Sequence, residues 1–322
     1  MNYSETVVLE KTVVIDYLTL SIDFLKVQES STGHWVVGAV DLYNELLFLL
    51  GHETGYLTLQ PDRPLHGMMV GFRLGEHIRI SYGGHHTKSA EGDYPLILEL
   101  TGKACREFEN YLNGNWLNLF KFVLNHEKFR VTRFDLAIDD YTGNEITFYE
   151  LIELFKMKSF TTNFRSYTFI ESGAIFSNQL GINGESLYFG KRDSENQLII
   201  YNKFAQLLEE GRRSEVNSDY HYRYEMRFSG EKAKLILETF YQMNIDHASN
   251  DFMNFASSLL LQLLEFKDPE SNRAKVRDRK IHPGWLKFLE NVAKSELRIS
   301  APEEVTLEKK EEWMEYSMGT TF

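Results

Sequence analysis

The residues best suited to chemistry are a tyrosine and a lysine two positions apart, Tyr201 and Lys203. They end an apolar run, 197–203, that follows a second run, 186–190, across a short polar connection, and such a pair predicts a β-hairpin. Positions two apart on a strand share a face, so the phenol and the ammonium point the same way. Because residues 204–210 have helical character, Tyr201 is expected at a strand-to-helix junction.

A phenol, with a pKa of about 10, attacks poorly unless a cation stabilises the phenolate. Lys203 could supply that cation, or a metal could polarise the group under attack. The alternative is a structural tyrosine, because the chain has 17 tyrosines. Periodicity alone does not separate Tyr201 from Tyr188, which lies in the same hairpin.

A second run whose side chains could take part in catalysis is Arg133-Phe134-Asp135-Leu136-Ala137-Ile138-Asp139-Asp140. With a period of two, Asp135, Ala137 and Asp139 share a polar face, and the small alanine leaves space between two carboxylates. Oxygen ligands in such an arrangement suit Mg²⁺ or Mn²⁺. The alternative is a solvated sheet face on which Arg133 pairs with Asp135.

The run His221-Tyr222-Arg223-Tyr224-Glu225-Met226-Arg227-Phe228 has the same alternation. Its polar face carries Arg223, Glu225 and Arg227. Glu225 is either one member of a salt-bridged ladder or a third metal ligand with arginines placed for phosphates. Together the three runs suit attack by a tyrosine on a phosphodiester, in which cations offset the charge of the transition state.

Composition sets outer limits on the class of protein. The chain has 322 residues, 43% of them hydrophobic, which is enough for a packed core in one or two domains. Its net charge of −12 argues against a nonspecific coat on nucleic acid but does not exclude a local basic patch. One cysteine, no long apolar segment and no signal-peptide pattern predict a cytoplasmic protein.

Periodicity and breakers predict an α+β fold with a mostly antiparallel central sheet flanked by helices. Strands are expected at 12–22, 68–74, 77–82, 96–100, 128–139, 162–170, 186–190, 197–201 and 221–228. Helices are expected at 39–50, 103–124 (interrupted near 113–115), 148–156, 231–241, 252–266 and 285–293.

Short echoes predict that the sheet is built from two repeated halves, 12–124 and 128–243. Leu20-Ser21-Ile22-Asp23 resembles Leu136-Ala137-Ile138-Asp139, and Gly102 and Gly230 each open an expected helix. Residues 1–245 are therefore expected to form a catalytic domain. Residues 246–322 are expected to form a helical C-terminal region with the most basic stretch of the chain, 272–280.

The ordered set of runs resembles the Rep_trans family of rolling-circle plasmid replication initiators and the related relaxases of integrative elements. The resemblance is carried by Ile15-Asp16-Tyr17-Leu18, the run 133–139, Tyr188-Phe189-Gly190-Lys191-Arg192, Ile200-Tyr201-Asn202-Lys203 and the run 224–228. It implies a protein that nicks one strand at a plasmid double-strand origin. Tyr201 would become linked to the 5′ phosphate and leave a 3′ hydroxyl as primer.

The family is similar to the HUH endonucleases, yet no His-hydrophobic-His motif occurs here, which favours acidic metal ligands. The resemblance implies Asp135, Asp139 and Glu225 as ligands of Mg²⁺ or Mn²⁺, a homodimer, and a UvrD-like host helicase as partner. It also places origin recognition near the carboxyl end. The residues expected to contact DNA are Arg133, Lys191, Arg192, Arg223, Arg227, Arg273, Lys275, Arg277, Arg279 and Lys280.

Three other functions fit the residues. A conjugative relaxase would share the chemistry and differ in its origin. A non-catalytic initiator would bind and melt origin DNA without cutting it, and a metal-dependent hydrolase would attack phosphates with water.

Overall fold

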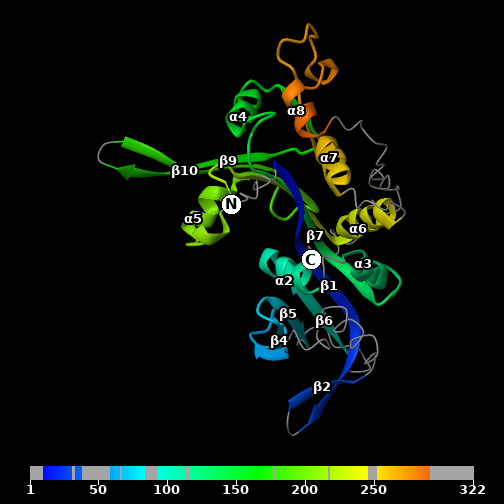
Figure 1. Ribbon diagram of the computed structural model, residues 1–322. Helices are drawn as coiled ribbons and strands as arrows, with labels where there is room; N and C mark the ends of the chain where they lie inside the picture. The colour runs from blue at the N-terminus through cyan, green and yellow to red at the C-terminus, as the bar shows by residue number, and fades with distance from the viewer. Residues whose placement is uncertain are drawn as a thin grey trace, which may run out of the picture.

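A computed structural model gives the structure of the chain at residues 10–30, 33–37, 59–65, 67–83, 93–112, 116–176, 179–216, 218–245 and 252–290 (Figure 1). The strands are β1 (Lys11–Ser30), β2 (Gly33–Val37), β3 (Leu59–Asp62), β4 (Val70–Leu74), β5 (Ile78–Tyr82), β6 (Asp93–Leu100), β7 (Phe129–Asp140), β8 (Phe160–Thr162), β9 (Tyr167–Phe176), β10 (Gln179–Phe189), β11 (Asn196–Asn202), β12 (Tyr222–Ser229) and β13 (Leu264–Phe266). The helices are α2 (Gly102–Leu112), α3 (Trp116–Leu124), α4 (Phe148–Lys156), α5 (Lys203–Glu209), α6 (Gly230–Ile245), α7 (Phe252–Leu263) and α8 (Pro283–Phe288), with 3₁₀ turns η2 (Arg213–Glu215) and η3 (Val276–Asp278).

Eleven of the described strands form one sheet in the order β3-β4-β5-β6-β1-β7-β12-β11-β10-β9, and β2 pairs with β1. Neighbouring strands run antiparallel throughout. The fold class expected from the sequence, an α+β fold around a mostly antiparallel sheet, is therefore confirmed.

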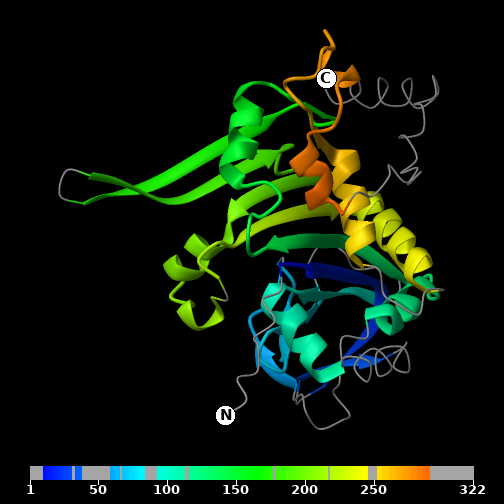
Figure 2. The ribbon, with the colours of Figure 1, turned by 45° about the horizontal axis from the view of Figure 1, so that its top comes forward.

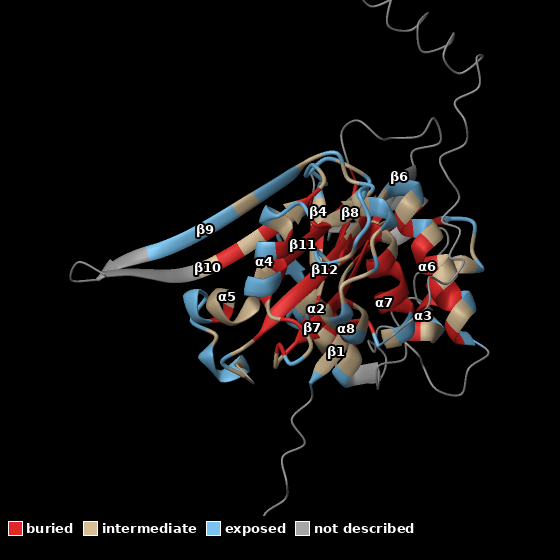
Figure 3. Cartoon of the chain, turned by 90° about the horizontal axis from the view of Figure 1, so that it is seen from above, coloured by how far each residue is buried: buried red, intermediate tan, exposed pale blue. Residues whose placement is uncertain are grey.

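One face of the central strands is apolar and is covered by helices. Phe134 on β7 meets Phe120 on α3 and Phe240 on α6 with ring centroids about 6 Å apart, and α7 packs on β1 and β7. In Figure 2 the gold helices α6 and α7 lie together along this side of the sheet. Buried residues gather in β7, β11, β12 and α7, as Figure 3 shows. The opposite face of these strands carries the charged residues of the sequence runs.

The sheet is arranged alike on the two sides of its central β1–β7 pair. Outward from β1 come β6, β5 and β4, and outward from β7 come β12, β11 and β10. Leu18 pairs with Leu100 two residues before Gly102, and Phe134 pairs with Phe228 two residues before Gly230. The echoes in the sequence thus fall at matching places in the sheet, although the repeat and the domain boundary at residue 245 stay predictions.

Several expected elements match the structure closely. Helix α4 has the predicted bounds, and it begins at Phe148 because Thr147 and Glu150 form a capping box there. The predicted hairpin is β10–β11, in which Ser186 pairs with Tyr201. Strands β9 and β10 extend well beyond the prediction and project as an arm from the body of the protein (Figure 1).

Two expected elements were wrong. The helix predicted over 252–266 ends at Leu263, because Leu264–Phe266 turns into a strand that pairs with β8. The strand predicted over 162–170 is divided between β8, in this small second sheet, and β9. The expected helix at 39–50 and the tail beyond residue 290 lie outside the described residues.

Candidate active site

Three neighbouring strands bring the charged runs together on the polar face of the sheet. Arg223 on β12 lies opposite Asp139 on β7, and Arg227 lies opposite Asp135. Tyr201 on β11 lies opposite Arg223 on its other side. Cross-strand partners share a face, so the tyrosine and both carboxylate runs meet on one surface.

A cleft of about 490 Å³ opens on this surface. Its floor is formed by β1, β7, β11 and β12, and its walls by the first turn of α2 and by the α5–η2 segment. Its cationic lining residues are Lys103, Arg106, Arg133, Lys203, Arg212, Arg223 and Arg227; its carboxylates are Asp16, Asp139, Glu215 and Glu225. Cations therefore outnumber carboxylates seven to four in a chain whose net charge is −12. Such a cleft attracts a polyanion.

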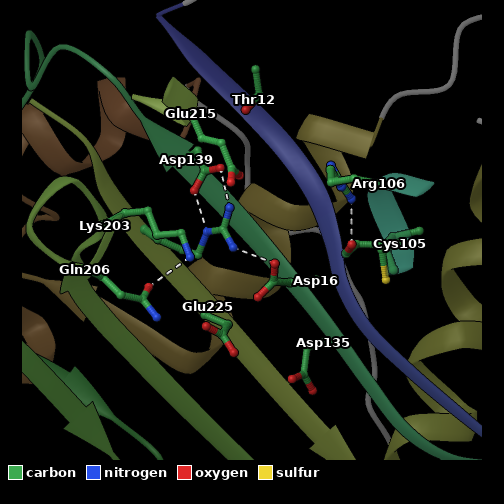
Figure 4. A network of polar contacts seen from close by, with 12 residues as sticks. Thr12, Asp16, Cys105, Arg106, Asp135, Asp139, Lys203, Gln206, Glu215 and Glu225 are labelled. Carbon is green, nitrogen blue, oxygen red and sulfur yellow. Dashed lines mark hydrogen bonds and ion pairs between the residues drawn. The ribbon is translucent and has the colours of Figure 1, made fainter. Parts of the chain in front are cut away.

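Arg223 is the centre of a buried ion network. Its Nε and Nη2 each donate to a carboxylate oxygen of Asp139 at 2.7 Å, and its Nη1 donates to Asp16 at 2.5 Å. Burial alone would raise the pKa of Asp139, but the charge and hydrogen bonds of Arg223, aided by His221, hold it below its ordinary value. Figure 4 shows Asp139 and Asp16 joined through this one guanidinium.

Glu225 and Asp135 have arginine partners of their own. Arg227 donates to Glu225 at 2.6 Å, and Arg133 donates to both oxygens of Asp135 at 2.6–3.1 Å. Asp135 is fully buried beside Arg133 and Arg227 and does not line the cleft. Its burial raises its pKa to about 7, against the opposing charge of Arg133.

Tyr201 and Lys203 both line the cleft, at the end of β11 and the start of α5. The Lys203 ammonium lies 5.6 Å from the centroid of the Tyr201 ring and donates to Gln206 at 2.9 Å. Burial raises the pKa of the Tyr201 phenol well above its ordinary value, and Arg223 acts against this shift. The phenol therefore stays protonated at neutral pH. Tyr188, its rival in the hairpin, does not line the cleft.

The predicted metal ligands supply oxygen atoms suited to a hard cation, but here they face arginines. Within the described ranges no three His, Cys, Asp or Glu side chains are arranged to hold a metal ion. Asp135, Asp139 and Glu225 are each paired with a different arginine. The present arrangement therefore does not fit a metal, and these carboxylates could bind a metal ion only if the arginine side chains moved away from them.

Two groups of the expected DNA-contacting residues lie away from the cleft. Lys191 and Arg192 are exposed in the turn between β10 and β11, at the opposite end of that hairpin from Tyr201. The basic stretch Arg273, Lys275, Arg277, Arg279 and Lys280 belongs to the connection between β13 and α8. Neither group lines the cleft.

Sequence reasoning assigned no role to several residues of the cleft, of which Asp16 and His221 are the most central. Pairing of β1 with β7 shifts between Ile15 and Tyr17, a bulge that lets the adjacent residues Asp16 and Tyr17 both line the cleft. His221 Nε2 lies 3.3 Å from Asp139, and its ring lies 4.5 Å from that of Tyr141. Asp16 stood in a run that carried the family resemblance, but nothing in its spacing indicated a bulge.

Comparison with solved structures shows that the fold is shared. The chain resembles the rolling circle replication initiator protein from Geobacillus stearothermophilus with a TM-score of 0.67 and 20% sequence identity. The likeness covers 88% of this chain and 96% of that one. At this level of identity it defines the architecture and no more.

The sequence comparison defines the family. Residues 129–322 match the Rep_trans model, described as replication initiation factor, and the chain belongs to that family. It is also 25% identical over 259 residues to a Bacillus subtilis (strain 168) protein provisionally described as the DNA relaxase NicK. That match covers 78% of this chain and 68% of the relative. The family predicted from the sequence is thus confirmed.

No helix in the described part of the chain is long and apolar enough to cross a membrane.

Proposed function

We propose that the protein is a site-specific DNA nickase and strand transferase that initiates rolling-circle replication, with Tyr201 as its nucleophile. The observation that carries this proposal is a cation-rich cleft with Tyr201 in its lining, within an acidic chain. A phosphodiester backbone is the polyanion that such a cleft suits, and a phenol in the lining can attack its phosphorus.

The cations around Tyr201 have a role in this reaction. Arg223 lies opposite Tyr201 on the neighbouring strand, and the Lys203 ammonium lies above the Tyr201 ring. Arg133 and Arg227, about one-third exposed, could turn from Asp135 and Glu225 toward a phosphate. These charges would offset the negative charge that develops as the phenol oxygen attacks.

The covalent step transfers a phosphate from DNA to the protein. The Tyr201 oxygen forms a bond to phosphorus, the bond from phosphorus to the 3′ oxygen breaks, and the proton that the phenol loses is taken up, through solvent, by the departing 3′ oxygen. The product is a 5′ phosphotyrosine and a free 3′ hydroxyl that primes synthesis. The family resemblance makes Asp135, Asp139 and Glu225 the candidate ligands of Mg²⁺ or Mn²⁺. They would hold such an ion only if their arginine partners moved away, and the ion would then polarise a phosphate oxygen.

Origin DNA and two protein partners complete the proposal. The exposed stretch Arg273–Lys280 and the turn at Lys191 and Arg192 would contact duplex DNA outside the cleft, where exposed cations neutralise phosphates. A homodimer and a UvrD-like host helicase are proposed from the family resemblance, with a cytoplasmic location.

Two alternative functions, one enzymatic and one not, are also compatible with the cleft. The 25% identity to a relative described as a relaxase favours a conjugative relaxase with the same cleft and chemistry. The raised pKa of Tyr201 would equally suit an initiator that binds DNA without cutting it.

One experiment separates these functions. Supercoiled plasmid carrying the origin is incubated with the protein and Mg²⁺ or Mn²⁺, and covalent adducts are resolved on denaturing gels. We expect an adduct with the wild type and with Tyr188→Phe, and none with Tyr201→Phe. Nicking without an adduct would indicate a hydrolase, and binding without nicking would indicate a non-catalytic initiator. An adduct on transfer DNA in place of plasmid origin DNA would indicate the relaxase.

A further inference from the structure

The catalytic cleft continues into a second cavity. This cavity has a volume of about 380 Å³ and is lined by α2, by the turn before β5 at Glu76 and His77, and by the segment that contains η2. Lys103, Arg106, Arg212 and Glu215 line both spaces. The two spaces therefore adjoin between α2 and η2, and together they are called the channel below.

The two sides of this passage differ in how their charges are engaged. On the η2 side, Arg212 is bound to Glu210 and Glu215 at 2.5–2.7 Å. On the α2 side, Arg106 donates to the Ile15 carbonyl and to Glu109. Lys103 is exposed, and its ammonium forms no ion pair with any described residue. One cation at the junction is thus available to a ligand.

Two of the three acids of the second cavity are engaged by hydrogen bonds, and the third, Glu76, is exposed and lies 3.8 Å from His77. Glu107 accepts hydrogen bonds from the backbone N–H groups of Glu76 and His77 at 2.7 and 2.8 Å. Glu215 is held by Arg212. An anion that enters the channel therefore meets the charge of Lys103, while Glu215 is paired with Arg212 and Glu107 is held by backbone N–H groups.

Charge also distinguishes this route from the space on the other side of α5. A cavity of about 840 Å³ lies there, lined by Tyr149, Tyr220 and Tyr222 with the acids Glu209 and Asp219. No lysine or arginine is among its lining residues. A phosphate backbone that passes Tyr201 would therefore be repelled on that side of α5 and attracted on the α2 side.

We infer that the channel between α2 and η2 is a binding subsite for the single-stranded DNA that flanks the scissile phosphate, and that Lys103 contacts a backbone phosphate in it. This inference rests on the proposed nicking function, because it takes its starting point from Tyr201. The subsite reads charge and not sequence, as is usual for grooves that follow a single strand. In this inference α2 forms a wall of the DNA-binding channel, although the predicted catalytic residues lie on β7, β11 and β12, in the other half of the sheet.

The test measures affinity as a function of strand length. Oligothymidylates of about four and about twelve nucleotides, labelled with fluorescein, are titrated by anisotropy into the Tyr201→Phe protein, so that no cleavage interferes. We expect Lys103→Ala to weaken binding of the long strand about fivefold and to leave the short strand unchanged. The salt slope for the long strand should fall by about 0.7, the value for one lost phosphate contact on a single strand. Lys103→Arg should bind both strands as the parent protein does.

A matched control and two outcomes make the test decisive. Lys121→Ala removes an exposed lysine of α3 that lines neither space, and it should change neither affinity. Equal weakening of both strands by Lys103→Ala, or no weakening of either, would overturn the subsite. Failure of the wild type to form an adduct, with the length effect intact, would instead overturn the nickase and leave the subsite standing.

Discussion

The two sides of the central β1–β7 pair share a strand order but differ in chemistry. On the β7 side, the polar face carries Asp139, Arg223 and Glu225 in buried ion pairs beside Tyr201. On the β1 side, the position equivalent to Glu225 is Ile97. Glu225 pairs with Ala137 of β7, and Ile97 pairs with Ser21, which is the equivalent residue of β1. An apolar residue thus stands where the other half has a carboxylate.

The β1 side has its own polar residues, but they form a different network. Tyr17 donates to Glu99 at 2.5 Å, and the Arg133 guanidinium lies 3.8 Å from the centroid of the Tyr17 ring. Arg79 is 3.7 Å from Glu99 on the outer side. This half lends Asp16, Tyr17, Lys103 and Arg106 to the cleft, chiefly as wall. The same strand arrangement therefore carries the candidate site in the β7 half and encloses that site in the β1 half.

The largest expected contrast between the halves is in stability. Arg223→Ala would leave Asp139 and Asp16 without their shared cation in a buried setting, and it should lower the free energy of unfolding by about 3–5 kcal/mol. Arg79→Ala in the other half removes a partly exposed cation with ion pairs of 3.7–3.9 Å and one hydrogen bond, of 3.2 Å, to the Arg63 carbonyl. It should change stability by about 0–1 kcal/mol. Urea unfolding of both variants measures the difference. Equal losses would show that the buried network is not a special feature of the β7 side.

The pH dependence of nicking distinguishes Tyr201 from Tyr17, another tyrosine of the cleft lining. Because burial raises the pKa of Tyr201, its phenol stays protonated up to and above pH 10. Below that pKa the phenolate fraction grows about tenfold per pH unit, so single-turnover nicking should rise between pH 7 and pH 10 without a plateau. Tyr17→Phe should leave the slope unchanged. A plateau below pH 9 would indicate that Lys203 lowers the phenol pKa after all.

Metal binding offers a third contrast. If Glu225 is a ligand, Glu225→Gln should weaken Mn²⁺ binding by at least about tenfold, since a second-shell change alone reaches that range. Glu99→Gln changes a buried carboxylate on β6 that lies outside the cleft lining, and it should have no effect. Electron paramagnetic resonance of free and bound Mn²⁺ measures both without DNA. Unchanged binding in Glu225→Gln would remove this residue from the proposed ligand set.

How far the sequence could go depends on the kind of interaction. Alternation within residues 133–139 was enough to predict a strand and its polar face, since a period of two is a local property. The same pattern could not show that Asp135 is fully buried or that Asp139 faces Arg223, because register is set by strands far apart in the chain. The bulge at Asp16 was also hidden, as it breaks the very alternation on which the prediction relied. The apolar run 252–266 likewise gave no sign of the change from helix to strand at Leu264.

The smallest expected effects come from the two glycines that begin α2 and α6. A Cβ on Gly102 would lie 2.9 Å from the Asp16 carboxylate, whereas a Cβ on Gly230 would meet nothing within 4 Å. Gly230 has a φ of +58°, so Gly230→Ala should lower stability by about 1 kcal/mol through backbone strain and leave the nicking rate unchanged. Gly102→Ala strains no left-handed backbone, but it displaces Asp16 from Arg223, so it should lower the nicking rate and remove part of the stability that this ion pair contributes. Unfolding curves and single-turnover nicking rates of both variants test this difference. Loss of nicking in Gly230→Ala, or full nicking in Gly102→Ala, would contradict the view that the β1 half acts on the site through Asp16.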